Sequence, residues 1–201
     1  MNALASRDRL FSELHAEAFK ARGFKKRGHW LVRELGPLVQ TAYLRASRFS
    51  SSDEAVFWID IQIFSESWLG LVFPLRPGKI PNEGTPSLFS QELGAWCTPP
   101  LTSHRIKQEA DAAELLVKLA SAAKSTAIPS LDSCETPANL LATLVASASN
   151  PAYLAIVGLS RMLGHEQQAQ HFMALAKQEA AHENELRFLQ LREEAIWRNA
   201  V

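Results

Sequence analysis

The stretch AVFWIDIQIF, residues 55–64, decides the fold. Large apolar side chains recur at every second position, so Phe57 and Ile59 share one face of an extended strand. The intervening positions are mixed and include Asp60 and Gln62. A strand of this kind predicts a sheet with one face in the core and the other face only partly covered.

Two further strands and a helix are predicted on the N-terminal side of this stretch. Residues 30–35 and 38–47 alternate in the same way, and Gly36-Pro37 interrupts them, which indicates an antiparallel hairpin. Residues 8–21 instead carry apolar side chains at helical spacing, and Gly23 stands where a glycine would end that helix.

The C-terminal side is predicted to be mostly helical. Residues 67–77 favour a fourth strand, and residues 76–108 are rich in proline and glycine, which indicates an irregular segment anchored by apolar side chains. Helix-start signals occur at Thr136-Pro137 and Asn150-Pro151, where a capping side chain precedes proline. Helices are predicted at residues 109–125, 136–148, 150–163 and 166–197, the last two joined at residues 164–166 as an αα-hairpin.

These elements predict an α+β protein. An N-terminal helix packs on an antiparallel sheet of about three to five strands, followed by a helical C-terminal region ending in an αα-hairpin. We expect a sheet domain over residues 1–130 and a helical tail over residues 131–201, because proline, serine and acidic residues gather near their junction.

The composition narrows the classes of partner. Lys plus Arg and Asp plus Glu both number 21, so the overall charge favours neither nucleic acid nor an anionic membrane. No apolar run approaches the about 18 residues that a membrane-spanning helix needs, and no signal peptide is evident. Cys97 and Cys134 stand alone, which is typical of a reducing compartment, and we expect a cytoplasmic protein.

Four polar residues of the predicted sheet form a candidate polar site. A two-residue loop at Gly36-Pro37 would place Arg33 opposite Gln40 on one face. Asp60 and Gln62 would join them if the register of the third strand brings their face into line. The alternative is an internally satisfied ion-pair and amide network, or ordinary solvent exposure.

Lys25, Lys26 and Arg27 form a candidate basic surface. Lysine and arginine supply sequence-independent affinity for phosphates. The flanking Phe24 and Trp30 fit better as core anchors at a helix end and a strand start, so the interpretation that we favour is a solvated turn.

Metal-binding motifs are incomplete. His165 and His171 are six positions apart, whereas a zinc-binding helical pair needs its histidines four positions apart. Glu179 and His182 have the spacing of a di-iron ligand pair, but the sequence holds no second copy. We therefore predict neither a metal nor a cofactor.

Catalytic motifs are equally sparse. Cys97 followed by His104 is the local pairing that could give an activated thiolate. The sequence contains no GxSxG serine elbow, no Walker A loop and no GxGxxG motif. A non-enzymatic role is favoured, with no catalytic residue assigned.

Residues 11–65, and more loosely the whole of residues 1–120, resemble the DUF 4304 family, a bacterial family of unknown function. The resemblance implies a bacterial source and a helix followed by three strands, and it implies no reaction. Arg45 stands where the family pattern has a second glutamine. The matching pieces are Gly23-Phe24-Lys25-Lys26, Gly28, Trp30, Arg33, Leu38-Val39-Gln40, Ser47-Arg48-Phe49 and residues 57–65.

Three functions remain open from the sequence. The first is a protein-binding module, of a regulatory or immunity type by analogy, which would use the partly covered sheet or the helical tail. The second is an enzyme built on the sheet cluster or on Cys97 with His104, and the third is a nucleic-acid binder using the basic N-terminal segment. Residues 151–178 are similar in outline to one tetratricopeptide repeat, but no second copy is visible, so this segment would pack on the sheet domain or expose an apolar stripe to a partner. The C-terminal helices are also a candidate surface for self-association.

Overall fold

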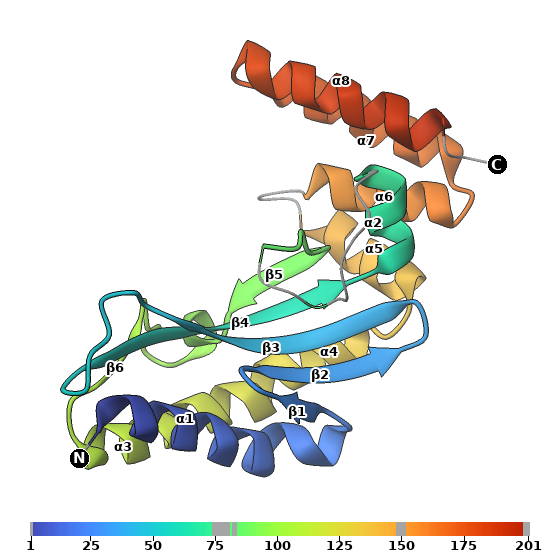
Figure 1. Cartoon of the computed structure of the whole chain (residues 1–201). Coiled ribbons are helices and arrows are strands. Elements are labelled where there is room, and N and C mark those ends of the chain that lie inside the picture. The colour runs from blue at the N-terminus through green and yellow to red at the C-terminus, as the bar shows by residue number, and fades with distance from the viewer. Residues whose placement is uncertain (1, 74–80, 82–83, 148–151, 199–201) are drawn as a thin grey trace. The chain divides into compact units, whose positions relative to one another are not determined.

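The chain has the predicted α+β fold (Figure 1), and it divides into two compact units. The computed structural model describes residues 2–73, 81, 84–147 and 152–198. Whether residues 1–130 and 131–201 are separate domains stays a prediction. Unit 1 comprises Met1–Glu34, Gln40–Ile63 and Ser90–Asp132, and unit 2 comprises Leu35–Val39, Phe64–Phe89 and Ser133–Val201.

A six-stranded antiparallel sheet has the order β1-β2-β3-β4-β5, with β6 also paired to β4. The three strands predicted most strongly are confirmed as β2, β3 and β4. Residues 76–108, which were expected to be irregular, supply β5 and β6. The strands are β1 (Lys25–Arg27), β2 (Trp30–Leu35), β3 (Leu38–Ala46), β4 (Ala55–Phe64), β5 (Phe89–Glu92) and β6 (His104–Ile106).

Glycine makes the two N-terminal hairpins possible. Arg27 pairs with Trp30, so Gly28 and His29 form a two-residue loop, and Gly28 has a φ of 60°. Gly36, in the next loop, has a φ of 56°. A positive φ at the first loop position suits the tight turns whose twist matches that of the flanking strands, and only glycine adopts it without strain.

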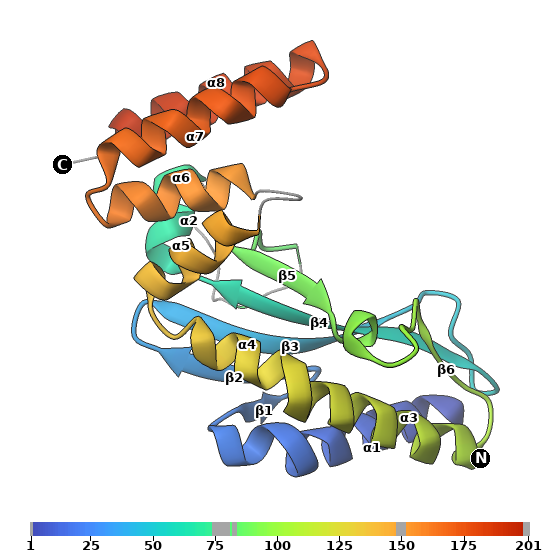
Figure 2. The ribbon, with the colours of Figure 1, turned by 180° about the vertical axis from the view of Figure 1, so that it is seen from behind.

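The helices of unit 1 cover one face of its sheet (Figures 1 and 2). α1 (Ala3–Leu14) lies beside α3 (Glu109–Ala122), which continues through a π-helical turn into α4 (Ile128–Ser133). The N-terminal helical segment begins at Ala3, earlier than the predicted residue 8. It ends at Gly23, which adopts a left-handed backbone conformation as its C-terminal cap. The core between these layers includes Leu10, Phe11, Leu14, Phe19, Leu31, Leu44, Phe57, Ile59, Ile61 and Leu119, all fully buried.

His104 is a buried titratable group of this core. It is 2% exposed and pairs with Phe57 across the β4–β6 ladder, with the two rings in an edge-to-face contact at 5.2 Å. Its Nδ1 atom has no hydrogen-bond partner among the described residues. Burial lowers the pKa of His104 to about 4, and the Asp60 carboxylate offsets this only in part.

The second segment of unit 2 contains a helix where a strand was predicted. Residues 66–72 form α2 (Glu66–Val72), which is capped by the Ser65 side chain accepting from the Trp68 amide at 3.3 Å. The fourth strand predicted at 67–77 is therefore wrong over residues 67–73, and its remainder lies outside the described residues. The serine cap and the burial of three of the seven helical side chains outweigh the local strand propensity.

The remaining helices of unit 2 are α5 (Pro137–Ala146), α6 (Tyr153–Met162), α7 (Glu166–Glu179) and α8 (Glu183–Arg198). Thr136 caps α5, and Gly164 ends α6 before the α6–α7 hairpin, both as predicted. The cap predicted at Asn150-Pro151 lies outside the described residues. The prediction of a single helix over residues 166–197 is wrong, because the helix is interrupted between Glu179 and Glu183, which gives α7 and α8.

No helix in the described part of the chain combines the length and the apolar character needed to cross a bilayer.

Close approach of α2 to α6 holds unit 2 together. The Trp68 indole donates to the Leu154 carbonyl at 3.1 Å, and its ring lies against Gly158. A Cβ atom on Gly158 would stand 2.4 Å from Trp68 Cδ1 and 2.5 Å from Nε1. Gly158 therefore provides the space in which Trp68 is buried to 3% exposure.

We expect acid to destabilise unit 1 through His104. Above pH 6.5 the imidazole is neutral in both states. As the pH falls from 6.5 to about 4, the unfolded chain binds a proton that the folded chain does not, which removes about 3 kcal/mol of stability. Urea unfolding of wild type and His104→Gln across this range measures the effect. Wild type should lose stability more steeply, and parallel pH profiles would contradict the prediction.

Replacing Gly158 with alanine should destabilise unit 2 by about 2 kcal/mol, because the new methyl group collides with the Trp68 ring. Gly70→Ala is the matched control. Gly70 also lies within a helix, and its added Cβ atom would meet nothing within 4 Å, so alanine there should stabilise by about 0.5–1 kcal/mol. Denaturant unfolding of both variants tests this, and a Gly158→Ala protein as stable as wild type would refute it.

Candidate binding pocket

The structure brings Arg33 and Gln40 together, as predicted for the two strands of the hairpin. Arg33 Nε donates to Gln40 Oε1 at 3.0 Å, and Arg33 Nη2 donates to the Asp132 carboxylate at 2.7 Å. Gln40 is fully buried, and its amide donates to the Leu131 carbonyl of α4 at 2.7 Å. The Arg33 guanidinium also lies over the Phe24 ring at 4.9 Å. These contacts tie the sheet to α4.

Asp60 and Gln62 lie on the opposite face of the sheet from this network. Alternation along β4 places them with Trp58, away from the buried Ile59 and its neighbours. Asp60 pairs with Arg45 at 2.7 Å. The Arg45 guanidinium lies 4.6 Å from the centre of the Trp58 ring. The four residues of the predicted polar site therefore fall into two separate places.

Among the described residues, the Gln62 Oε1 atom is buried without a hydrogen-bond partner. Arg45, the neighbour of Asp60 on this face, also pairs with Glu92 of β5 at 2.9 Å. Asp60 is thus held in an ion-pair network that joins β3, β4 and β5, an internal network of the kind that the sequence left open as the alternative.

The basic residues Lys25, Lys26 and Arg27 form β1 rather than a turn. All three are exposed along this short edge strand, and Arg27 pairs with Glu34 at 2.9 Å. Charged side chains on an edge strand discourage pairing with other chains. Protection of the sheet edge therefore explains why basic residues occupy these positions. Phosphate binding by this surface stays a prediction.

Cys97 and His104 lack the properties of a nucleophile and its base. Cys97 is 5% exposed, and its thiol lies 3.9 Å from the carbonyls of Leu93 and Lys118. Burial raises the pKa of Cys97, and the Lys118 charge opposes this only in part, so the thiol form is favoured at neutral pH. A nucleophilic cysteine requires the opposite shift of its pKa.

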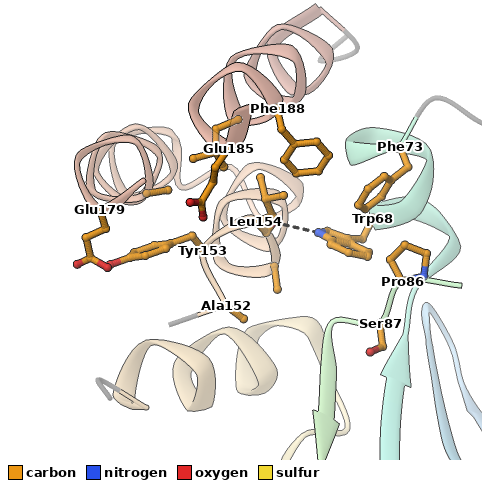
Figure 3. Close-up of a pocket in the computed structure, with 13 residues that line it drawn as sticks. Trp68, Phe73, Pro86, Ser87, Ala152, Tyr153, Leu154, Glu179, Glu185 and Phe188 are labelled. Atoms are coloured by element: carbon orange, nitrogen blue, oxygen red, sulfur yellow. Dashed lines mark hydrogen bonds between the residues drawn. The ribbon is translucent and has the colours of Figure 1, made fainter. Parts of the chain in front are cut away.

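Unit 2 contains a pocket that the sequence did not reveal (Figure 3). Its volume is about 510 Å³, within the range of small-ligand sites. We call it the aromatic pocket. It is formed by α2, the start of α6, the end of α7, the first half of α8 and the loops that carry Phe73 and Ser87. Its characteristic residues are Trp68, Phe73, Tyr153, Glu179, Glu185 and Phe188.

One side of the aromatic pocket is apolar (Figure 3). Trp68 and Phe73 meet edge to face, with ring centres 5.5 Å apart. Because the Trp68 indole N–H is already bonded to Leu154, the indole can offer an occupant its ring surface. Phe188 of α8 faces the same side and is 39% exposed.

The other side of the aromatic pocket is acidic. The Tyr153 hydroxyl points to the Glu179 carboxylate, and this hydrogen bond, with smaller effects of burial and of the Glu179 charge, raises the pKa of Tyr153. Glu185 accepts a hydrogen bond from the Ala181 amide at 3.1 Å. Within the described residues, no salt bridge involves either carboxylate. Both glutamates are exposed and retain acceptor capacity for an occupant.

A guanidinium of the chain itself lies next to this pocket. The Arg192 guanidinium carbon lies 4.7 Å from the centre of the Phe73 ring and 4.8 Å from that of Phe188, and its Nη1 donates to the Val72 carbonyl at 3.2 Å. Arg192 does not line the pocket. It braces two of the aromatic walls by joining α8 to the end of α2.

Sequence reasoning missed this site because its parts lie far apart in the chain. Glu179 was considered only as half of a di-iron motif, but it ends α7 while His182 lies in the link before α8. Across the described residues, no group of three or more His, Cys, Asp or Glu side chains could hold a metal ion. The break between α7 and α8, which has glutamates on both of its sides, is a feature of the structure and was not indicated by any pattern in the sequence.

The aromatic pocket can bind an occupant by ring surface and by negative charge. Among the described residues that line it, the titratable groups are a tyrosine, whose raised pKa keeps it protonated, and two glutamates at the surface. Comparisons of the chain with protein-family models, with curated proteins and with solved structures found no match. The function is therefore argued from the geometry of the site.

We expect Arg33 to hold unit 1 together, because removing it takes away the donors that Arg33 gives to the buried Gln40 Oε1 atom and the partner that it gives to the half-buried Asp132 carboxylate. Arg33→Ala should lower the free energy of unfolding by about 3 kcal/mol. Arg22→Ala is the control, because Arg22 reaches the same Asp132 carboxylate at 3.4 Å from an exposed position. This substitution should lower the free energy of unfolding by less than about 1 kcal/mol. Equal stabilities of the two variants in urea would show that the network does not stabilise the fold.

Proposed function

We propose that this chain is a non-enzymatic binding module that engages another protein through the aromatic pocket. The observation that carries the proposal is the composition of the pocket, with aromatic walls on one side and two glutamates lacking ion pairs among the described residues on the other. Interfaces between proteins draw much of their energy from aromatic residues in such hollows.

The chemistry of the pocket favours binding over catalysis. The Trp68 indole N–H and the Tyr153 hydroxyl are each engaged within the chain. General acid–base catalysis needs a group whose pKa lies near the working pH, and the pKa of Tyr153 moves away from that range. Apolar surface with a few orienting polar groups is typical of a recognition site.

Apolar surface continues outside the pocket, which favours a macromolecular occupant. Leu191 is 58% exposed and lies three residues after Phe188, so both side chains lie on neighbouring positions of α8. A small molecule inside the pocket would leave Leu191 in water. A protein segment that enters the pocket and continues along α8 would cover it.

We further propose membership of the DUF 4304 family and a bacterial, cytoplasmic setting for the chain. The family proposal is supported by the quoted sequence pieces of residues 11–65. The setting is supported by Cys97 and Cys134, which are both buried and form no disulfide within the described part of the chain, as suits a reducing compartment. A regulatory or immunity-type role is consistent with a binding module and is proposed by analogy alone.

Site-specific crosslinking tests the proposed function. A photoreactive phenylalanine analogue at position 188 should capture a protein from extracts of the source cells, whereas the same group at position 49 should not. Phe49 is the matched control, because it is a phenylalanine of unit 1 that is 77% exposed. The captured protein is then identified by mass spectrometry and purified.

The affinity of the purified partner gives the decisive result. Phe188→Ser should weaken binding by about tenfold or more in calorimetry, because an aromatic contact at the pocket is lost, while Phe49→Ser should leave affinity unchanged. Circular dichroism checks that both variants are folded. Equal affinities of the two variants would overturn the proposal that the aromatic pocket is the binding site.

A further inference from the structure

We infer that the aromatic pocket receives an arginine side chain of the partner protein. This inference rests on the proposed function and adds to it the chemical class of the residue recognised. It is carried by the charge of the pocket, by the way the chain already holds a guanidinium, and by the placement of the two kinds of wall.

The charge of the pocket is negative. Among the described residues, Glu179 and Glu185 are its charged lining residues, and no described lysine or arginine lines it. The N-terminus of α6, near Tyr153, contributes about half a positive charge, which is smaller than the two full negative charges. Lys177 on α7 is engaged with Glu193, so it does not supply the missing counter-charge. A cationic occupant is therefore favoured over an anionic or neutral one.

Arg192 shows that these aromatic side chains accommodate a guanidinium. Its planar head lies over both Phe73 and Phe188 at distances typical of cation–π contacts. The positive charge of Arg192 opposes a second cation, but it lies outside the lining and reaches the Val72 carbonyl instead. The ring surfaces of Trp68 and Tyr153 remain as walls for an occupant.

The arrangement of the walls favours arginine over a smaller cation. In Figure 3, Tyr153, Glu179 and Glu185 lie toward one side of the pocket, and Trp68, Phe73 and Phe188 lie toward the other. An arginine side chain combines an apolar stem with a flat head that stacks on rings and donates several hydrogen bonds to carboxylates. It can contact both sides at once, and the volume of about 510 Å³ leaves room for its flanking residues.

Two blocked pentapeptides that differ in charge alone test the inference. Both have leucine on either side of the central residue, which is arginine in one and its neutral isostere citrulline in the other. Binding to the full chain is followed by the NMR signal of the Trp68 indole N–H. The arginine peptide should bind about fivefold more tightly at low salt, and high salt should reduce this preference, since both glutamates are exposed.

Glutamine variants locate the preference in the pocket. Glu179→Gln/Glu185→Gln should bind the two peptides equally, because glutamine keeps the acceptors for Tyr153 and Ala181 but removes the charges. Glu183→Gln/Glu194→Gln removes the same charge from positions that do not line the pocket and should keep the preference. Equal binding of the two peptides to wild type, or loss of the preference in both double variants, would overturn the inference.

Two further outcomes separate this inference from the proposed function. If the crosslinked partner loses affinity with Phe188→Ser but not with Glu179→Gln/Glu185→Gln, the binding site stands and the arginine assignment is wrong. If N-propylguanidinium binds as tightly as the arginine peptide, the pocket binds a free small cation. The assignment of an arginine side chain of the partner protein as its occupant is then wrong. The inference is supported if the arginine peptide binds more tightly than both the citrulline peptide and N-propylguanidinium.

Discussion

The apolar face of β4 is the constraint around which unit 1 is built. Phe57, Ile59, Ile61 and Ile63 are each at most 1% exposed. The helices α1, α3 and α4 lie on one face of the sheet of this unit (Figures 1 and 2). Burying a side chain of this size contributes about 1.5–3 kcal/mol, so the four together outweigh any single polar contact of the unit. Because side chains alternate along a strand, fixing this face also fixes which polar residues point toward the helices and which point to the other face of the sheet.

The polar residues of the sheet follow from that alternation. Arg33 and Gln40 share the face covered by α4, where Arg33 reaches Asp132 and Gln40 reaches a backbone carbonyl. Burying these groups is tolerable because each finds hydrogen-bond partners there. Asp60 points away and is held by Arg45 at the other face. One network joins the sheet to α4, and the other joins β3, β4 and β5. These structural roles explain why polar side chains occupy these positions, and no ligand is needed to account for them.

Unit 2 follows a different rule, in which contacts between helices form the aromatic pocket. Trp68 can be buried against α6 only because Gly158 has no side chain, and its satisfied N–H makes the indole an apolar wall. The break between α7 and α8 brings Glu185 and Phe188 to the same pocket as Glu179. A site made from several helix ends is therefore sensitive to packing that lies outside the site itself.

The sequence by itself determined the α+β class, the strands β2 to β4, the Arg33–Gln40 pairing and the Thr136 cap, because strand alternation, two-residue loops and capping are local rules. It did not determine α2, where apolar and aromatic residues suit a strand or a helix equally, or the break that divides residues 166–197. The aromatic pocket was decided by tertiary structure alone. Its residues run from Trp68 to Leu189, and no local pattern specifies which helix ends will meet, because that depends on how side chains pack.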